Sequence, residues 1–481
     1  MLIKVMKGKM LMKIILNGKQ EEVLALQAKG HVVVLGTAGS GKTTIALYRA
    51  IHLSKIPNSG RILLVTFNNA LVKYMQHLCD QISNKLVVEN YHKFARGYLN
   101  SRGKMPRNCI LNDKDEKYFL IEKAVNELRD KFPEESTFKR PKQFFVDEIV
   151  FIQRFGYLNY EDYQSSERIG RSGANIKREN RKWVYQVYER YLKLREEQGK
   201  KYDWDDIAFY VYNELKNDKS DRRYNHIIID EGQDFSPMMI RSLAEAVNKN
   251  GSLTFFGDVS QQIYGSRLSW RDSGIDVNKI WRFDINYRNP VTVAKFAKSV
   301  TENKYWSHDK DMVDMQMQIA EGPKPSLLCF SSINAERQWI VKQAVEIGKL
   351  SSVAIICRNR AEIDTLLGIF RANRYNPIEI NKNTPGYADE KKVYLTTYHA
   401  AKGLEFENVI IPYLSAEKFP DPELINNSIS PENVYSDELK LLYVAATRSK
   451  FGLYMTYSGN LSPLFPEDTS VYDFVNEEEV N

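Results

Sequence analysis

The segment Gly36–Thr43 (GTAGSGKT) matches the phosphate-binding pattern GxxxxGK[ST] at every fixed position. Glycines let backbone N–H groups curve around phosphate oxygens, and the start of a following helix adds a positive dipole end. In this pattern Lys42 contacts the β- and γ-phosphates, and the Thr43 hydroxyl binds Mg²⁺. A predicted strand precedes the pattern and a predicted helix follows it, so we interpret it as a nucleotide site. Its residues are Gly36, Thr37, Ala38, Gly39, Ser40, Gly41, Lys42, Thr43 and Thr44.

Two adjacent carboxylates stand at the end of another apolar run, Ile227–Asp234 (IIIDEGQD). At the C-terminal end of a strand, Asp230 can hold Mg²⁺ through water, and its neighbour Glu231 can polarise the attacking water. Such a pair could instead cap a following helix. The presence of Gly36–Thr43 in the same chain favours the hydrolytic interpretation.

Two arginines are candidates for contacting the γ-phosphate. Arg288 lies in the sequence NYR, and Arg448 lies in Val444–Lys450 (VAATRSK), which we predict to be helical. A guanidinium stays charged and binds phosphate oxygens in pairs. If an arginine of one domain contacts a nucleotide that the other domain holds, hydrolysis of the nucleotide would change the gap between the two domains. From spacing alone, either residue could equally be an ordinary surface arginine.

Short apolar runs rich in β-branched residues provide the strands that must position these groups. His31–Leu35 and Arg61–Thr66 each precede a helical pattern, Lys42–Leu53 and Asn69–Ile82. Alternation of strand and helix predicts a doubly wound α/β fold. Further strands are predicted at His226–Ile229, Ser252–Phe256, Ser351–Cys357, Lys392–Thr396, Val409–Pro412 and Gly452–Thr456. The chain therefore divides into two α/β domains.

The character of the chain changes between about residues 100 and 199. Apolar residues recur there at helical spacing among many charges, as in Lys117–Phe132 and Trp183–Arg195, and predict a helical insertion in the first domain. Its middle, Glu167–Lys182 (ERIGRSGANIKRENRK), is strongly basic and contains two glycines. This segment is either a solvated loop or an arm that contacts phosphates.

Composition sets broad limits on the class of protein. The net charge of +7, from 68 basic and 61 acidic residues, is compatible with binding a polyanion but is weak support for it. No apolar run is long enough to span a bilayer and no signal peptide is recognisable, so we expect no membrane association. The four cysteines are far apart and suggest neither a zinc site nor a disulfide framework. We expect a cytoplasmic protein.

Taken together, these motifs resemble the superfamily 1 helicases of the UvrD/PcrA/Rep type over residues from about 16 to 457. The resemblance implies two RecA-like P-loop domains. The first would comprise residues 1–100 and 205–285, with a helical insertion at 101–204. The second would comprise 286–460 with little or no further insertion, because the interval between Arg288 and Thr396 is short. Residues 461–481 would form a polar tail.

The resemblance also implies roles around ATP. Gln20 would read the adenine edge, Tyr287 would stack on adenine, and Gly403 and Glu405 would face the nucleotide. Gln261 would sense the γ-phosphate, which completes the predicted catalytic set: Lys42, Asp230, Glu231, Gln261, Arg288 and Arg448. The expected cofactors are ATP and Mg²⁺, the latter on Thr43 and Asp230.

Single-stranded DNA is the expected partner, with RNA left open, and the family moves 3′ to 5′. The residues implied for contacting nucleic acid are Phe67, Asn68, His92, Tyr264, Arg267, Trp270 and His399. Relatives often carry a tryptophan two residues after the position of Tyr264, where this chain has Ser266, so Trp270 could substitute. Relatives also often have a large residue at the position of Gly232.

The sequence therefore predicts an ATP-dependent DNA helicase or translocase. An alternative is a nucleic-acid-binding switch in which ATP controls docking to a partner nuclease or effector without processive unwinding. A P-loop enzyme of another class, such as a small-molecule kinase, is disfavoured by the order of the later motifs. The chain shows no nuclease motif, so any cleavage would need another polypeptide.

Overall fold

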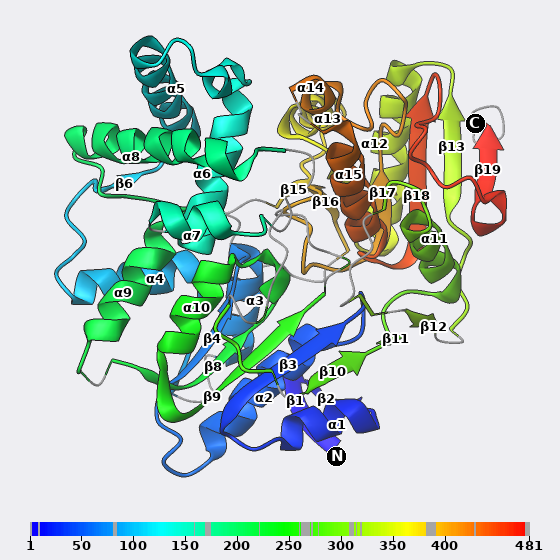
Figure 1. The fold of residues 1–481 in the computed structure, drawn as a ribbon. Helices are drawn as coiled ribbons and strands as arrows, with labels where there is room; N and C mark the ends of the chain where they lie inside the picture. The colour runs from blue at the N-terminus through cyan, green and yellow to red at the C-terminus, as the bar shows by residue number, and fades with distance from the viewer. Residues whose placement is uncertain are drawn as a thin grey trace.

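The computed structural model describes residues 2–7, 10–79, 84–157, 159–168, 175–220, 222–258, 260, 270, 273–277, 279–306, 312–313, 315–317, 320–380, 391–427 and 430–476. Three regions are visible in Figure 1: a first lobe that is blue and green, a helical region in cyan and teal above it, and a second lobe from yellow to red. None of the described helices is long and apolar enough to cross a membrane.

The first lobe is built on a six-stranded sheet of order β10-β3-β9-β8-β4-β5. All neighbouring pairs are parallel, as buried β-branched runs predict. Its strands are β3 (Gly30–Gly36), β4 (Ile62–Thr66), β5 (Leu86–Asn90), β8 (Tyr224–Ile229), β9 (Val247–Gly257) and β10 (Ile280–Phe283). A separate antiparallel hairpin, β1 (Leu2–Lys7) and β2 (Met10–Ile15), precedes the lobe.

Helices cover both faces of this sheet. Val34, Leu64 and Ile228 pack on one side, whereas Val33 and Leu63 pack on the other, since alternate side chains of a strand point to opposite faces. The first side is covered by α1 (Gly18–Ala25), α2 (Lys42–Lys55) and α3 (Asn69–Cys79). The second is covered by α4 (Tyr91–Ser101), α9 (Ile207–Asn217) and α10 (Pro237–Glu245).

A helical region interrupts the first lobe between α4 and α9, as predicted. Its helices are α5 (Lys114–Lys131), η1 (Ser136–Lys139), α6 (Lys142–Phe155), α7 (Tyr160–Ser165), η2 (Arg178–Asn180) and α8 (Arg181–Glu197). These pack around a core of their own that includes Phe144, Ile149 and Tyr191. The short parallel pair β6 (Ile110–Leu111) and β7 (Tyr202–Asp203) closes the region at its base.

The second lobe contains a parallel seven-stranded sheet of order β15-β16-β14-β17-β18-β13-β19. Its strands are β13 (Ser326–Phe330), β14 (Val353–Cys357), β15 (Ile378–Glu379), β16 (Val393–Thr397), β17 (Phe406–Ile411), β18 (Ser449–Ser458) and β19 (Asp473–Asn476). One face carries α11 (Val291–Thr301) and α15 (Pro431–Ala446), and the other carries α12 (Ile333–Leu350) and α13 (Arg360–Ala372). The remaining elements are η3 (Gly232–Asp234) in the first lobe, and β11 (Ile285–Asn286), β12 (Gln316–Met317), α14 (Pro422–Asn427) and η5 (Thr469–Val471). The two-lobed α/β architecture with a helical insertion agrees with the prediction.

The predicted polar tail at 461–481 is wrong for the residues up to Asn476. Leu464 and Phe465 are 1% and 3% exposed, and β19 extends the second sheet by pairing with β13. The sequence is misleading here because Pro463 and Pro466 punctuate the segment like a loop, while its apolar residues pack against α11. The segment is therefore part of the second lobe.

Candidate nucleotide site and nucleic-acid interface

The P-loop lies between β3 and α2. Gly39 and Gly41 have φ of +71° and +81°, where side chains with a Cβ are strained. A Cβ at Gly39 would also lie 2.1 Å from Oδ1 of Asn286, which comes from β11. Glycine is thus required at Gly39 by conformation and by the close approach of the chain entering the second lobe.

Lys42 begins α2, and its ammonium is buried among oxygen atoms. Its Nζ donates to the carbonyls of Gly36 and Thr37, at 2.9 and 2.6 Å, and lies 3.3 Å from Oδ2 of Asp258. Both side chains of the Lys42–Asp258 pair are largely shielded from water. Asp258, which the sequence analysis did not assign, therefore helps to orient the lysine. Thr43 and Thr44 follow on the same helix.

Asp230 stands at the C-terminal end of β8 and is 1% exposed. Burial, and then the charge of Glu231, raise the pKa of Asp230 to about 7, while the nearby Thr43 hydroxyl opposes this shift. Neither carboxylate oxygen has a hydrogen bond of good geometry within the described part of the chain. A buried carboxylate with two unused oxygens beside a threonine hydroxyl fits a divalent cation, which prefers oxygen ligands.

Glu231 has a φ of +52°, a strained conformation for a residue with a side chain. Its Oε2 accepts a hydrogen bond of 2.6 Å from Nε2 of Gln233. Burial by itself would raise the pKa of Glu231, but the charges of Lys402 and Lys42 outweigh it and lower the pKa. The side chain is therefore held charged at neutral pH, as a group that polarises water requires.

Gly232 is explained by the aromatic ring beside it. A Cβ at this position would lie 2.2 Å from Cε2 of Phe255, and a Cβ at Gly257 would lie 2.7 Å from Cε1 of the same ring. The Phe255 ring therefore fills the volume that a large side chain at position 232 would need. This accounts for the departure from the family pattern noted in the sequence.

The second lobe contributes an ionic group close to the P-loop, since a Cβ at Gly39 would lie 2.8 Å from that of Arg288. Nε of Arg288 donates to Oε1 of Glu405 over 2.7 Å, and Lys450 lies 3.4 Å from the other carboxylate oxygen. Burial would raise the pKa of Glu405, but the charges of Arg288 and Lys450 hold it at about 2. Arg288 and Glu405 thus lie together, although they are far apart in sequence.

Arg448 lies in the turn between α15 and β18, so the helix predicted over Val444–Lys450 is confirmed only as far as Ala446 and is wrong beyond it. The helical spacing of apolar residues ends at Ala446, and from Ser449 the apolar residues belong to a strand. The guanidinium is 1% exposed, and its Nε donates to the carbonyl of Val444 over 2.9 Å. Burial, and then the charge of Arg288, lower the pKa of Arg448 to about 10.

Tyr443 in α15 brings the second lobe into direct contact with the P-loop. Burial raises the pKa of its phenol, while hydrogen bonds to the Thr37 side chain and the Ala38 backbone oppose the shift. Ala38 itself packs in a core cluster of the second lobe. Tyr443 was not predicted as a site residue, because among its apolar neighbours it resembles an ordinary core residue.

Lys402 forms a buried link between the lobes. Its Nζ lies 2.5 Å from Oδ1 of Asp234, and both side chains are less than 5% exposed. Its carbonyl accepts a 2.7 Å hydrogen bond from Nδ2 of Asn68. The next residue, Gly403, lies against Leu71 of α3, and its assignment to the nucleotide stays a prediction. Lys402 thus contacts both the carboxylate segment and a predicted nucleic-acid contact.

The residues predicted for adenine meet at the edge of the P-loop. Nε2 of Gln20 donates to the carbonyl of Ser40 over 3.1 Å. The backbone N–H of Tyr287 donates to the carbonyl of Gly39 over 2.9 Å, and its hydroxyl accepts a hydrogen bond from Nδ2 of Asn17. Tyr287 is 40% exposed, and its role as a stacking partner of adenine stays a prediction.

Two of the predicted nucleic-acid contacts lie in an aromatic cluster at the end of β4 and the start of α4. The rings of Phe67 and His92 are 5.6 Å apart, and His92 lies 4.9 Å from the ring of Trp204. Phe67 also packs edge-to-face on the buried ring of Phe235. Trp204 was missed because it lies in the acidic segment after the helical insertion, far from His92 in sequence.

The other predicted contacts are placed differently. Trp270 is partly buried and packs edge-to-face on Phe255 at 5.0 Å, against the core of the first lobe. His399 lies at the end of β16, and burial, followed by the charges of Arg358 and Lys402, lowers its pKa to about 4. Gln261, Tyr264 and Arg267 lie outside the described residues.

Comparisons with known proteins agree with these motifs. The family described as the UvrD/REP helicase N-terminal domain matches residues 16–278, and the UvrD-like helicase C-terminal domain matches residues 378–460. A probable DNA helicase of Mycoplasma pneumoniae is 24% identical over 92% of this chain and 83% of its own length. DNA helicase II of Haemophilus influenzae is 25% identical over 72% of this chain, and the PcrA helicase of Leuconostoc citreum is 23% identical over 58%.

The chain is shorter than most of these relatives. The matched part covers 49% of the Haemophilus protein and 36% of the Leuconostoc protein. A solved C-terminal domain of a possible DNA helicase from a Lactobacillus matches 39% of this chain and 98% of its own, at 22% identity and a TM-score of 0.29.

Proposed function

The chain belongs to the UvrD-like family of superfamily 1 DNA helicases, and we propose on this premise that it is an ATP-driven motor moving 3′ to 5′ along single-stranded DNA. Residues 1–100 and 205–285 would form one motor domain, residues 286–460 the other, and residues 101–204 an insertion in the first. The segment after 460 would belong to the second domain.

The observation that carries the proposal is the convergence of both lobes on the P-loop. Tyr443 contacts Thr37 and Ala38, and Lys402 is paired with Asp234. Arg448 is near enough for its charge to lower the pKa of Glu231. A nucleotide bound at Gly36–Thr43 would therefore be held by groups of both lobes, so its hydrolysis would alter how they pack.

Lys42, Thr43 and Asp230 support a site for the phosphates of ATP and for Mg²⁺. Phosphate oxygens would replace the carbonyls of Gly36 and Thr37 as partners of the Lys42 ammonium. Mg²⁺ held by Thr43 and Asp230 would neutralise developing negative charge when bound. Glu231 would orient and polarise the attacking water, and Arg288 and Arg448 would stabilise charge on the γ-phosphate.

Lys402 would couple ATP hydrolysis to DNA binding. Its side chain is paired with Asp234 beside Glu231, and its backbone is tied to Asn68 in the segment that carries Phe67. Stacking of bases on aromatic side chains contributes about 1–3 kcal/mol per base and tolerates any sequence. Phe67 and His92 are therefore proposed to hold the strand. Through its hydrogen bond to Lys402, Asn68 would transmit a movement of the DNA-binding segment to that lysine.

Replacing Glu231 tests the catalytic assignment. Glu231→Gln should bind ATP like the wild type but hydrolyse it at least about 100-fold more slowly, because the amide cannot accept the proton of water. ATP affinity and DNA-stimulated ATPase rates are the measurements, with Glu423→Gln on the exposed α14 as the matched control. Wild-type hydrolysis by the Glu231 variant would exclude the proposed role.

A strand-displacement assay separates the motor from a nucleic-acid-binding switch that docks a partner nuclease or effector. No contact in the described residues favours the switch. The motor should displace the strand of a duplex carrying a 3′ single-stranded tail and leave a 5′-tailed duplex intact. ATPase activity stimulated by single-stranded DNA without displacement of either strand would favour the switch.

A further inference from the structure

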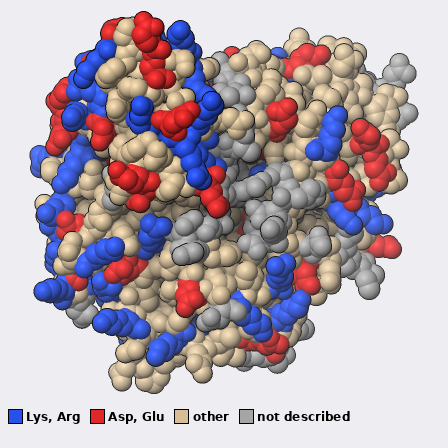
Figure 2. Space-filling model, in the orientation of Figure 1, with Lys and Arg blue, Asp and Glu red and all other residues tan. Residues whose placement is uncertain are grey.

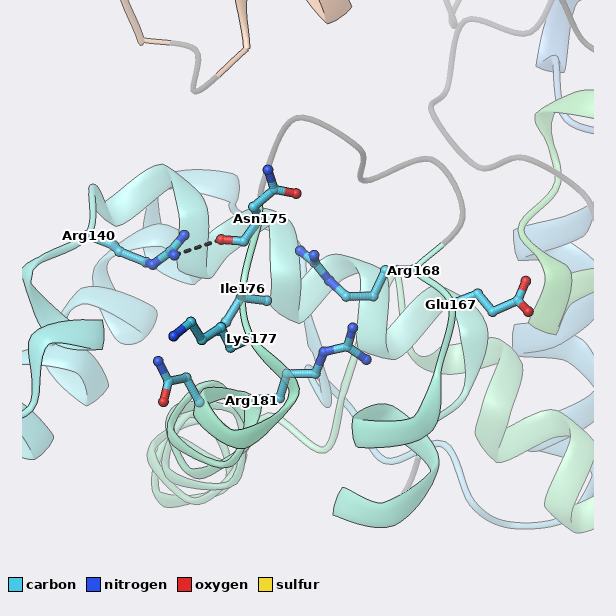
Figure 3. A pocket seen from close by; sticks show the side chains of 8 residues that line it. Arg140, Glu167, Arg168, Asn175, Ile176, Lys177 and Arg181 are labelled. Atoms are coloured by element: carbon cyan, nitrogen blue, oxygen red, sulfur yellow. Dashed lines mark hydrogen bonds between the residues drawn. The ribbon is translucent and has the colours of Figure 1, made fainter.

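Basic side chains in this molecule differ in how their charges are balanced. Figure 2 shows many Lys and Arg side chains on the surface of the helical region, interspersed with Asp and Glu. A pocket of that region, drawn in Figure 3, is lined by Arg168 and Arg181, while the carboxylate of Glu167 points away from them. Arg168 is paired with Glu148, and Nη1 of Arg181 donates instead to the carbonyl of Ser166 over 2.8 Å. Each of these two cations therefore has an acceptor of its own.

Near the P-loop, by contrast, two cations share one carboxylate. Glu405 immediately precedes β17, and its Oε1 lies 2.7 Å from Nε and 2.5 Å from Nη2 of Arg288. The other oxygen, Oε2, lies 3.4 Å from Nζ of Lys450, at the start of β18. Because Phe406 of β17 is paired with Ser449 of β18, the two neighbouring strands bring the carboxylate and the lysine together.

The single charge of Glu405 does not balance the cations around it. Burial alone would raise the pKa of Glu405, but the charges of Arg288, Lys450 and Arg448 lower it, so the group is ionised at neutral pH. The side chain of Glu405 is 37% exposed, and those of Arg288 and Lys450 are 16% and 27% exposed. Water therefore screens these charges only in part, and a second anion would be favoured beside them.

Arg288 lies where it can exchange one anion for another. Its Cβ is close to the P-loop, since a Cβ at Gly39 would lie 2.8 Å from it. Its guanidinium is turned toward the second lobe, where Glu405 and, at 3.4 Å from Nη1, the carbonyl of Thr447 accept its hydrogen bonds. The backbone of Arg288 is thus already beside the P-loop, and only the side chain would need to change its partner.

Lys450 makes such an exchange easier in two ways. Its positive charge repels the guanidinium of Arg288, which offsets part of the attraction between Arg288 and Glu405. It also stays beside Glu405 when Arg288 leaves, so a partly buried carboxylate is not left without a cation. The present 3.4 Å separation between Nζ and Oε2 leaves room for the ammonium to move closer, because charged hydrogen bonds shorten to about 2.7–2.9 Å.

We propose that Lys450 is a positioning residue that keeps Glu405 neutralised while Arg288 passes from this carboxylate to the γ-phosphate of ATP. This inference rests on the proposed function, because it needs a nucleotide at the P-loop. Lys450 acts on Arg288 through Glu405 and does not itself contact the phosphates. It therefore favours nucleoside triphosphates over diphosphates, since only a triphosphate offers Arg288 a new partner.

The test is the ratio of two affinities of the full chain, for a β,γ-imido analogue of ATP and for ADP, each with Mg²⁺. Lys450→Gln should weaken binding of the analogue about 5-fold and leave ADP binding unchanged, because Glu405 then retains Arg288 more strongly. Lys450→Arg keeps the charge and should restore the wild-type ratio. Lys349→Gln removes an exposed lysine paired with Glu346 in the same lobe, and as the matched control it should change neither affinity.

A second background tests whether Lys450 acts through Glu405. Glu405→Gln removes the charge that holds both cations, so adding Lys450→Gln to it should change the affinity ratio by less than about 1.5-fold. The full loss in this background would mean that Lys450 contacts the triphosphate directly. That result, an unchanged ratio in Lys450→Gln alone, or an equal loss for both nucleotides would overturn the proposal. Absence of ATP hydrolysis by the wild type with saturating single-stranded DNA would instead count against the proposed motor function.

Discussion

Two buried clusters of carboxylates in this molecule carry similar charges but differ in their partners. At the base of the helical region, Asp203 accepts hydrogen bonds from Gln153, Tyr191 and Arg195, and Asp206 lies 2.5 Å from Arg195. At the end of β8, Asp230 is equally buried but has two oxygens without a hydrogen bond in the described residues. The carboxylates at the base of the helical region are satisfied by protein donors, whereas, among the described residues, the oxygens of Asp230 are not.

The two aspartates also show that a raised pKa does not by itself identify a functional site. Burial, and then the neighbouring carboxylate, raise the pKa of both Asp206 and Asp230 to about 7. Asp206 nevertheless has good hydrogen bonds and serves the fold. Unmet hydrogen-bonding capacity, more than the shifted pKa, distinguishes the carboxylate that would bind a cation.

The largest expected effect comes from Asp230→Asn. ATPase activity should fall by about 100-fold or more, or roughly 3 kcal/mol of barrier, because a Mg²⁺ ligand is lost. Thermal stability in metal-free buffer should stay the same or rise, since the variant removes a buried charge that lacks a hydrogen bond. ATPase rates and thermal unfolding measure the two effects. A large loss of stability would make Asp230 a structural residue like Asp203.

The second prediction is the reverse outcome for Asp203→Asn. Unfolding should become easier by about 3 kcal/mol, because Lys117 and Arg195 lose a buried partner. The ATPase rate of the remaining folded protein should stay near that of the wild type. Denaturant unfolding provides the measurement. Asp364→Asn, in an exposed pair with Arg360, is the matched control and should change stability by less than about 1 kcal/mol.

The smallest expected effect concerns His399, in the turn that follows β16. Its pKa is lowered from 6.5 to about 4, so the unfolded chain binds more protons between these values. The stability that the neutral ring provides is therefore present above pH 6.5 and is lost as the pH falls toward 4. Relative to His399→Gln, the wild type should lose stability over this range. The full shift corresponds to about 3 kcal/mol, and solvent near this half-buried ring reduces the expected loss to on the order of 1 kcal/mol. Parallel unfolding curves of the two proteins across the range would contradict the lowered pKa.

The parts of the site that a short stretch of sequence determines were predictable. The P-loop residues are adjacent, and strand β3 and helix α2 follow from the apolar pattern around them. Asp230 and Glu231 were found in the same way, because an apolar strand leads directly into them. The helical insertion was also predictable, since the spacing in Lys117–Phe132 and Trp183–Arg195 is confirmed by α5 and α8.

Contacts between distant segments were not predictable from local patterns. Lys402 and Asp234 are 168 residues apart, and neither residue type indicates a buried pair. Similarly, β19 exists because β13 offers a free edge, which the sequence of Asp473–Asn476 does not reveal. The turn at Arg448 was missed because only Thr447 and Arg448 separate α15 from β18, and neither residue type marks a turn.

The fit of Phe255 against Gly232 restricts the order in which these two positions can change over evolution. Enlarging position 232 first would force its new side chain into the Phe255 ring and overpack the core. Shortening Phe255 first would leave a hole beside Trp270, with a cost of about 3–5 kcal/mol for complete truncation to alanine. Each single step therefore passes through a less stable protein. Descendants of this chain should keep the glycine and the phenylalanine together or replace both.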